Sequence, residues 1–487
     1  MAIVLGEESD SCMREYAPFV KGGETIDDSF SVLLPLPRAV KGEFKNNMMR
    51  KLVMALDVAA PHGELIDEAT RLYRKVTWRL IPFLFACYVA AYLDRVNVGF
   101  AKLQMLTDLQ FSETVYGLGA GIFFLGYFLF EVPSNIILHK VGARLWIARV
   151  MFTWAIISAG MMFVSSPTMF YVMRFLLGVA EAGLFPGVIL YLTYWYPAAR
   201  RGSIIAMFMT GIPIAGLIGG PLSGWIMHNL SGVQGLAGWQ WMFLIEALPS
   251  FILAFCVLAF LDNGIAEAKW LSADEKALLI RNIEADNTGA TKHRLRDGFT
   301  SPWVWLLSGI YLFFIMGLYG VGFWLPTLIK GAGVTDTLTI GFLTTIPYGA
   351  AAIAMIMVGR MSDAARERRW HIVVPGVIGA IGWLVSIQFS TNLVIAELAL
   401  TVATIGVLVT IAQFWCLPTA VLAGAAAATG IAVVNSVGNL AGFVSPYLIG
   451  WIIDSTHSIS LGVYTLAASL LIGSFLVLTM PKRLVNR

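Results

Sequence analysis

Charge is scarce in this chain of 487 residues, and that scarcity excludes most classes of soluble protein. Only 13% of the residues are Asp, Glu, Lys or Arg, whereas a soluble domain has roughly 25%. Hydrophobic residues make up 58% of the chain. So little charge cannot cover a large surface that faces water, and the composition predicts an integral membrane protein.

The motifs of metal, nucleotide and hydrolase sites are also missing. The four cysteines, Cys12, Cys87, Cys256 and Cys416, are scattered without Cys-x-x-Cys or Cys/His spacing. There is no G-x-x-x-x-G-K-[ST] phosphate loop, no H-E-x-x-H and no G-x-S-x-G. We therefore expect no metal, no cofactor and no enzymatic activity, and transport driven by ATP within this chain is excluded.

What the chain does contain is a series of apolar runs about 20 residues long, which is the length that crosses a bilayer. Six runs precede a polar interval at 262–300, and six follow it. The predicted spans are 77–99, 115–138, 144–164, 168–196, 202–227, 239–261, 302–329, 337–359, 371–390, 392–415, 423–452 and 460–480. The sequence thus predicts an all-α membrane protein of twelve helices, divided into six-helix halves at 71–261 and 301–487.

Basic residues accumulate in alternate loops, and in membrane proteins these loops face the cytoplasm. The loops on one side hold Arg71, Arg74, Lys75, Arg79, Lys140, Arg144, Arg200, Arg201, Arg360, Arg366, Arg368, Arg369, Lys482, Arg483, Arg487 and the bases of the 262–300 loop. The opposite loops hold Lys102 and Lys330. We expect a multi-pass protein of the cytoplasmic (inner) membrane with both termini and the central loop inside. Because these loops explain the net charge of +3, no nucleic-acid partner is expected.

Residues 1–70 differ from the rest of the chain. They mix charge, Gly and Pro without sustained periodicity, and they lack the features of a signal peptide. A disordered cytoplasmic tail is expected here. Met54 begins a short polar lead and is an alternative start of translation.

Two six-helix halves joined by a charged loop indicate an internally repeated secondary transporter, with its site between the halves near the bilayer midplane. The stretch GRMSDAARERR at 359–369 resembles the loop motif G-x-x-x-D-R-x-G-R-R of the major facilitator superfamily. The matching loop of the first half has His139 where Asp is usual. In the second half, Asp363 and Arg368 are the candidates for a cytoplasmic gate, although charge that merely sets topology is an equal alternative.

Two pairs of charged residues inside predicted spans stand out, Asp94 with Arg95 and Arg174 with Glu181, and each such charge costs at least about 2.5 kcal/mol at membrane depth. Asp94 lies about 24 Å along the first span from its inner end, and Arg174 about 7.5 Å below the outer end of the fourth, at 1.5 Å per residue. These depths agree, so the two are expected to pair. Glu181 lies two turns below Arg174, close to midplane. With Arg95 the four suggest a pathway for anions and protons, the alternative being an ion-pair network that locks helices together.

Five further stretches carry a more specific resemblance. They are YLDRVNVGFA at 92–101, GYFLFEVPSN at 126–135, RFLLGVAEAGLFPG at 174–187, YGVGFWLP at 319–326 and NSVGN at 435–439. From about residue 70 onward the chain resembles the anion:cation symporter family of the major facilitator superfamily, in its bacterial tartrate, phthalate and hydroxyphenylacetate permease-like branch. The resemblance implies uptake of organic carboxylates with protons. It also implies proton coupling by Asp94 and Glu181, and anion recognition and gating by Arg95 and Arg174.

Candidate substrate contacts follow from this chemistry. Arg95 is the first choice, because a guanidinium donates two parallel hydrogen bonds to a carboxylate and stays charged. Further candidates are Tyr92, Tyr319 and either Asn435 or Asn439, with Tyr311, Tyr348 and Gln413 behind them. Each of these polar residues could equally be interhelical packing. Glu131, near the inner end of the second span, fits a gate better than a substrate site.

The predicted function is therefore proton-coupled uptake of a small organic carboxylate such as tartrate or an aromatic acid, by a monomer in the lipid bilayer. One alternative is an antiporter or exporter, because GLIGGPLSG at 216–224 resembles the G-x-x-x-G-P-x-x-G-G stretch of drug/proton antiporters, although close helix packing also explains these glycines. Another is a transporter-like sensor of organic acids. The sequence leaves open which acid is bound, how many protons move and whether Na⁺ takes part.

Overall fold

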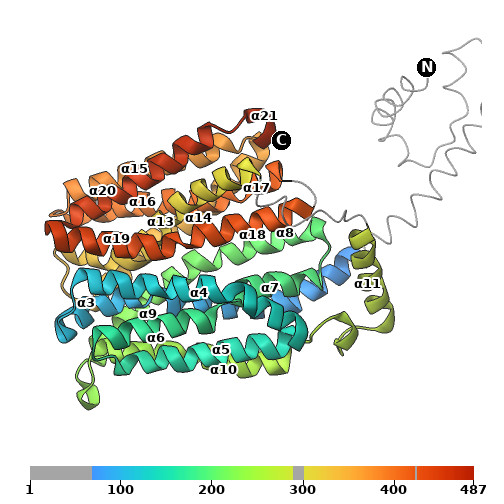
Figure 1. The fold of residues 1–487 in the computed structure, drawn as a ribbon, viewed down its shortest axis with the longest axis horizontal. Coiled ribbons are helices and arrows are strands. Elements are labelled where there is room, and N and C mark those ends of the chain that lie inside the picture. Colours follow the sequence, from blue (N-terminus) through green and yellow to red (C-terminus); the bar gives the residue numbers. More distant parts are fainter. Residues whose placement is uncertain (1–67, 289–300, 423–424, 487) are drawn as a thin grey trace, which may run out of the picture. The chain divides into compact units, whose positions relative to one another are not determined.

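The computed structural model describes residues 68–288, 301–422 and 425–486, and within them every regular element is a helix (Figure 1). Twelve helical stretches are long and apolar enough to span a membrane, which confirms the predicted number. They are Glu68–Leu109, Glu113–Val141, Ala143–Phe163, Pro167–Thr193, Met207–Asn229, Gly238–Phe260, Pro302–Gly331, Thr337–Ala365, Arg369–Gln388, Leu393–Val421, Gly430–Thr456 and Ile459–Leu478. The predicted tail at 1–70 lies almost wholly outside the described residues, and the contacts below all concern residues 74–486.

The labelled elements divide these spans further. They are α3 (Val98–Leu109), α4 (Glu113–Val141), α5 (Ala143–Gly160), α6 (Pro167–Glu181), α7 (Leu184–Thr193), α8 (Ala198–Met209), α9 (Gly211–Asn229), α10 (Gly238–Phe260), α11 (Ala273–Thr288), α13 (Pro302–Gly331), α14 (Thr337–Ala365), α15 (Arg369–Gln388), α16 (Leu393–Phe414), α17 (Cys416–Val421), α18 (Ala425–Asn439), α19 (Ala441–Thr456), α20 (Ile459–Leu478) and α21 (Lys482–Val485). Short 3₁₀ turns are η2 (Met161–Phe163), η3 (Val233–Gly235) and η4 (Ile265–Glu267). The predicted 262–300 loop therefore contains a helix, α11, and its residues 289–300 lie outside the description.

Local sequence explains where several helices begin. The side chains of Ser112, Ser166, Asp336 and Asn392 each accept a hydrogen bond from a backbone N–H in the first turn of α4, α6, α14 and α16. Such caps satisfy N–H groups that have no partner within the helix. The apolar runs set the number of spans, and these short polar residues set where they start.

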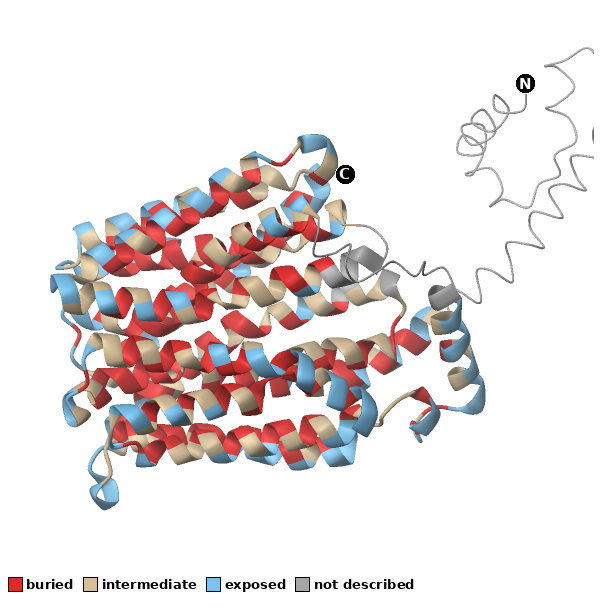
Figure 2. Cartoon of the chain, viewed as in Figure 1, coloured by how far each residue is buried: buried red, intermediate tan, exposed pale blue. Residues whose placement is uncertain are grey.

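The spans alternate in direction, so the bundle has two ends. We name them the α11 end, where α11, α17 and α21 lie, and the α3 end, where α3 finishes and α14 begins (Figure 1). Exposed positions occur along the length of the helices (Figure 2). The exposed residues include many large apolar ones, such as Val132, Ile353 and Phe475. Exposed apolar side chains suit a surface that faces lipid. The helices also satisfy their own backbone polar groups, as lipid requires.

The two halves contact each other closely at the α3 end. α9 packs on α14, and α4 packs on α19. A Cβ atom on Gly341 would lie 2.3 Å from the carbonyl oxygen of Gly220, and one on Gly117 would lie 2.2 Å from that of Pro446. We call these two helix contacts the seam. Backbones meet there without intervening side chains, so the structure is closed at the α3 end.

Polar contacts reinforce this closure. The Nζ atom of Lys330 donates to the carbonyl of Leu103 at 3.0 Å, and the Tyr116 hydroxyl donates to the carbonyl of Phe323 at 3.1 Å. Each of these bonds joins the first half to the second. The closed end therefore combines backbone packing with hydrogen bonds between the halves.

Candidate functional site

Arg95 lies at the centre of the candidate site and forms an ion pair with Glu181 of α6. Its guanidinium also faces the rings of Phe123 and Tyr127, at 5.4 and 5.2 Å from their centroids. The Nε atom of Arg95 is buried without a hydrogen-bond partner. The side chain of Tyr319, from the opposite half, approaches the same guanidinium. Arg95 is thus held through its Nη2 and keeps an unused donor at its Nε.

A break in the fourth span positions Glu181. α6 ends at this residue, and the chain turns through Gly183 with φ +90 before α7 begins. A Cβ atom at Gly183 would lie 2.2 Å from the Oγ atom of Ser134 and would strain the backbone as well. The glycine therefore allows the bend that leaves the Glu181 carboxylate at a helix end beside Arg95.

Asp94 faces away from Arg95 into the first half. Its carboxylate accepts hydrogen bonds from Trp154 Nε1 at 2.8 Å, Ser158 Oγ at 2.8 Å and Ser250 Oγ at 2.7 Å. These donors come from α5 and α10. Neighbouring residues on a helix point about 100° apart at 3.6 residues per turn, so Asp94 and Arg95 must face different partners. Asp94 is buried and has three hydrogen-bond donors but no ion pair in the described structure.

The predicted pair between Asp94 and Arg174 is therefore wrong. Arg174 donates instead to the carbonyl oxygens of Gly119 and Ala120 in α4, at 3.2 and 3.3 Å, and its guanidinium lies 5.0 Å from the ring centroid of Phe123. The predicted grouping of Asp94, Arg95 and Arg174 above a separate Glu181 is wrong for the same reason. A similar depth along two helices does not make their side chains point toward each other.

Of the candidates from the second half, Tyr319 approaches Arg95 and Asn435 approaches Glu131. Tyr319 is buried and packs on Phe124, with ring centroids 4.3 Å apart, so it belongs to the lining next to Arg95. Asn435 of α18 approaches the carboxylate of Glu131 in α4, which joins a predicted substrate residue to a predicted gating residue across the halves. Asn439 ends α18 one turn further on. Tyr92 is buried with its hydroxyl unpartnered.

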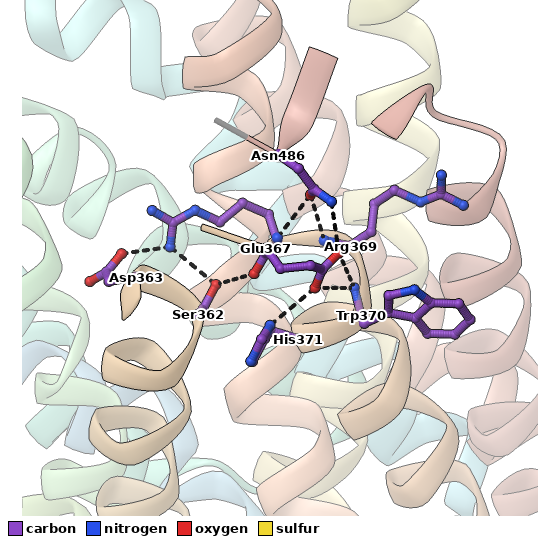
Figure 3. A network of polar contacts seen from close by, with 8 residues as sticks. Ser362, Asp363, Glu367, Arg369, Trp370, His371 and Asn486 are labelled. Carbon is purple, nitrogen blue, oxygen red and sulfur yellow. Dashed lines mark hydrogen bonds and ion pairs between the residues drawn. The ribbon is translucent and has the colours of Figure 1, made fainter. Parts of the chain in front are cut away.

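The predicted gate residues Asp363 and Arg368 form an ion pair within the second half, at 2.6 Å between Oδ1 and Nη1 (Figure 3). Arg368 also donates to Ser362 Oγ at 3.1 Å. Asn486, the last residue but one, joins this loop: its Oδ1 accepts from the backbone N–H of Arg368 at 2.9 Å and its Nδ2 donates to Glu367 at 3.0 Å (Figure 3). In this conformation the gate residues hold the α14–α15 loop and the chain end together.

Two carboxylates outside the spans illustrate the local electrostatics. Partial burial opposes ionisation of Glu367, but the N–H of Trp370 and the side chains of Asn486 and His371 lower its pKa. At the α3 end, hydrogen bonds from Thr339 and from His228 of α9 lower the pKa of Asp336 to about 2. The 2.7 Å contact between His228 Nδ1 and Asp336 Oδ1 also links the two halves.

Three buried charges were missed by the sequence reasoning. Lys102 is buried in α3, pairs with Glu113 at 2.7 Å and lies 3.5 Å from the ring centroid of Trp324. Glu246 in α10 accepts a 2.5 Å hydrogen bond from Ser223 Oγ, and Glu397 in α16 is buried with neither carboxylate oxygen paired. A single acid inside an apolar run was the available signal for both glutamates.

A largely buried guanidinium between two helical halves, in a bundle of twelve helices long and apolar enough to span a membrane, is compatible with a membrane transporter. Comparison with known families identifies which kind. Residues 84–446 match the model of the Major Facilitator Superfamily, and the chain belongs to that family. This confirms the resemblance that the loop motif and the five stretches indicated.

Several curated relatives cover most of the chain. NicT of Pseudomonas putida, provisionally named a metabolite transport protein, is 54% identical over 87% of this chain and 97% of its own. A protein of Agrobacterium vitis provisionally named a tartrate transporter is 47% identical over 85% of this chain and 92% of its own. A quinolone resistance transporter of Acinetobacter baumannii is 42% identical over 84% and 95%. The relatives thus include transporters named for quite different cargo.

Solved structures show the same fold. The xylose transporter XylE from E. coli, in a partially occluded inward-open conformation, superposes with a TM-score of 0.66 at 12% identity, covering 83% of this chain and 97% of its own. An inward-facing bacterial homologue of the lysosomal transporter Spinster gives 0.64 at 16% identity, over 82% and 94%. At such low identity these likenesses concern the fold alone.

Proposed function

We propose that this protein is a proton-coupled symporter that takes up a small organic carboxylate by alternating access. The observation that carries the proposal is Arg95, a largely buried guanidinium between the halves whose Nη2 pairs with Glu181 and whose Nε is unused. Guanidinium groups bind carboxylates through parallel hydrogen bonds. A relative named for tartrate supports the same class of cargo.

In the proposed orientation the protein lies in the cytoplasmic (inner) membrane and its α11 end faces the cytoplasm. The basic loop residues at that end support it, because Lys and Arg concentrate on the cytoplasmic side. The described Asp363–Arg368 pair lies at that end, whereas the seam lies at the opposite end. Closure at the α3 end then corresponds to an inward-facing or occluded state of a monomer, with the substrate path closed toward the outside.

Coupling follows from competition for Arg95. While Glu181 is ionised it occupies one edge of the guanidinium, and a proton on Glu181 weakens that pair and frees the edge for a substrate carboxylate. Asp94, the next residue to Arg95, carries a second proton among three hydrogen-bond donors. The halves rock, the protons leave on the inner side, and Glu181 displaces the anion.

The test is uptake of a labelled acid into proteoliposomes under imposed pH gradients. Uptake should rise with an inward proton gradient, and Asp94→Asn and Glu181→Gln should lose accumulation yet keep exchange of labelled for unlabelled substrate. Accumulation that ignores the gradient, or that persists in both variants, would contradict the coupling. Gly309→Ala, whose added Cβ would meet nothing within 4 Å, serves as a comparison for general damage to the protein.

The substrate itself can be found by thermal-shift screening of purified protein. A ligand that binds only the folded state stabilises it by RT ln(1 + [L]/Kd), or about 2.7 kcal/mol at 100 times Kd. Tartrate and phthalate are the first acids to screen. A true substrate should stabilise the wild type and fail to stabilise Arg95→Ala.

Export is the second candidate function, because one relative is named for quinolone resistance and 216–224 contains an antiporter-like glycine stretch. Fluoroquinolones carry a carboxylate, so Arg95 could serve either direction. Everted membrane vesicles distinguish export from uptake. Accumulation of the drug inside such vesicles, driven by protons leaving the vesicle lumen and absent in Arg95→Ala, would favour export.

A further inference from the structure

Glu246 of α10 is buried in the first half without a positive partner. It is 2% exposed, and its Oε1 accepts from Ser223 Oγ of α9 at 2.5 Å. Its Oε2 is buried and unpaired. An isolated carboxylate in such surroundings costs several kcal/mol when ionised, so it stays neutral unless a cation reaches it.

Asn97 completes this site from the first span. Its side chain is 2% exposed, approaches Glu246, and has neither its Oδ1 nor its Nδ2 hydrogen-bonded. The Asn97 amide can present either its nitrogen or its oxygen to Glu246, and with the oxygen presented a proton on Glu246 Oε2 supplies the donor that Oδ1 lacks. When one proton is added, the O–H at Glu246 Oε2 becomes a donor and Asn97 Oδ1 becomes its acceptor.

The surrounding charges give Glu246 no compensation in the described structure. Asp94 is an acid, and Ser250, one turn from Glu246 on α10, donates to it. Of the charges on neighbouring elements, Lys102 is held by Glu113 and Asp108 accepts from Trp239. The remaining ones are occupied too: Arg149 of α5 lies over the Trp146 ring and His228 of α9 contacts Asp336.

A count of the buried charges of this half also indicates that Glu246 lacks a positive partner. Apart from the Lys102–Glu113 pair, the described part of the half has four buried carboxylates, Asp94, Glu131, Glu181 and Glu246, against the buried guanidinium of Arg174 and the guanidinium of Arg95, whose side chain is 12% exposed. Two carboxylates are thus in excess. Neutrality of this interior requires about two protons.

A small cavity links the site to the seam. It has a volume of about 20 Å³, enough for about one water molecule. Asn97 and Ser223 line one side of it, and Thr344 and Tyr348 of α14 line the other. Separation of α14 from α9 would open this cavity, because residues of both helices line it.

We propose that Glu246, with Ser223 and Asn97, forms a proton-binding site that loads from the α3 end when the seam opens and is closed off when it shuts. The proton binds Glu246 Oε2 and stays there, and the resulting O–H donates a hydrogen bond to Asn97 Oδ1. Later transfer follows α10 to Asp94, whose carboxylate accepts from Ser250 one turn away. The binding site stands on the geometry alone, whereas its part in coupling rests on the proposed symport.

Infrared difference spectroscopy of the purified full-length protein in lipid nanodiscs tests the binding site directly. The wild type minus Glu246→Gln should show one neutral carboxyl C=O band, which shifts in D₂O. Ser223→Ala keeps the carboxyl and removes one hydrogen bond, so the band should move to higher frequency without being lost. Glu397→Gln, which removes a buried acid of the other half, should leave the Glu246 band unchanged.

Three results would overturn the proposal. One is a difference spectrum without a neutral carboxyl band, and another is a band that Ser223→Ala does not move. The third is thermal stabilisation by NaCl over choline chloride that Glu246→Gln abolishes, because that would make the site a sodium site. None of these readouts depends on transport, so they stand even if the symport proposal fails.

Transport measures the coupling separately. Removing one coupled proton should lower the maximal accumulation ratio about tenfold under a gradient of one pH unit, since each proton contributes about 1.36 kcal/mol per unit. Glu246→Gln should show this reduction while substrate binding stays unchanged. If the accumulation ratio equalled that of the wild type, Glu246 would bind a proton that is not transported with the substrate.

Discussion

Filling the seam should change which conformation the protein prefers. In Gly341→Ala the added Cβ would lie 2.3 Å from the Gly220 carbonyl oxygen, a separation that real Cβ contacts essentially never show. Both atoms belong to helix backbones, so α9 and α14 must move apart by close to 1 Å to reach ordinary contact. Overpacking of this kind costs about 1–3 kcal/mol.

This penalty falls on the closed state only, because the two helices separate when the α3 end opens. A bias of about 1–3 kcal/mol changes the closed-to-open ratio about 5- to 150-fold. Spin labels at Ser231 and Thr335, which are exposed on opposite halves at the α3 end, report this ratio through their distance distribution. The longer distance should become dominant in Gly341→Ala, and uptake should slow because closure is required in each cycle.

The matched control is Gly309→Ala in α13, where a Cβ meets nothing within 4 Å. It places the same substitution in a membrane helix but away from the seam, so its distance distribution should equal that of the wild type. If Gly341→Ala shows the same distribution as Gly309→Ala and both remain folded, the seam does not control closure and the reasoning fails.

Three other changes have defined outcomes. Arg95→Lys keeps the charge but loses the planar fork, and a lost charge-assisted hydrogen bond of about 1.5–3 kcal/mol should weaken acid binding roughly 10- to 100-fold in calorimetry. Folding lowers the pKa of Asp336 from 3.8 to about 2, so its contribution to the free energy of unfolding is present above pH 3.8 and lost as the pH falls through about 2. Melting curves of Asp336→Asn should lack that loss of stability at low pH. Asp336→Ala should in addition lose about 1 kcal/mol, because the helix cap is removed. Asn486→Ala leaves the N–H of Arg368 without its acceptor and should lower stability by about 1–3 kcal/mol in thermal melts, whereas an unchanged melting temperature would show that the chain end contributes nothing.

The number of spans could be predicted from the sequence because it depends mainly on one physical effect, the transfer of apolar runs from water into lipid. The predicted run at 302–329 and the observed Pro302–Gly331 differ by two residues. The nearly continuous apolar stretch from 392 to 452 was harder to divide. There the observed spans, Leu393–Val421 and Gly430–Thr456, are separated where polarity gives little signal.

The candidate site was predictable in its residues but not in its pairs. Depth along a helix follows from counting residues, so the levels of Asp94 and Arg174 were accessible. Which neighbour each side chain faces depends on how the helices are rotated and packed, and here also on the break at Gly183. For this reason the partner of Arg95 proved to be Glu181, and Asp94 proved to face α5 and α10.

Glu246 shows a different limit. The sequence contains only one acid in that run, with no base nearby to draw attention to it. Its partner Ser223 is 23 positions earlier, and a lone serine in a span has no distinctive pattern. Only the packing of α9 on α10 shows that the two meet.

The glycines of the seam have a consequence for how this protein can vary. Every single-base change that alters a glycine codon to another amino acid introduces a side chain with a Cβ atom, so Gly341 and Gly117 have no smaller neighbour in sequence space to pass through. Residues around Arg95 can change cargo step by step through substitutions of similar size, but the seam cannot drift in this way. Among relatives that carry different substrates, the closing surface should therefore vary less than the pocket.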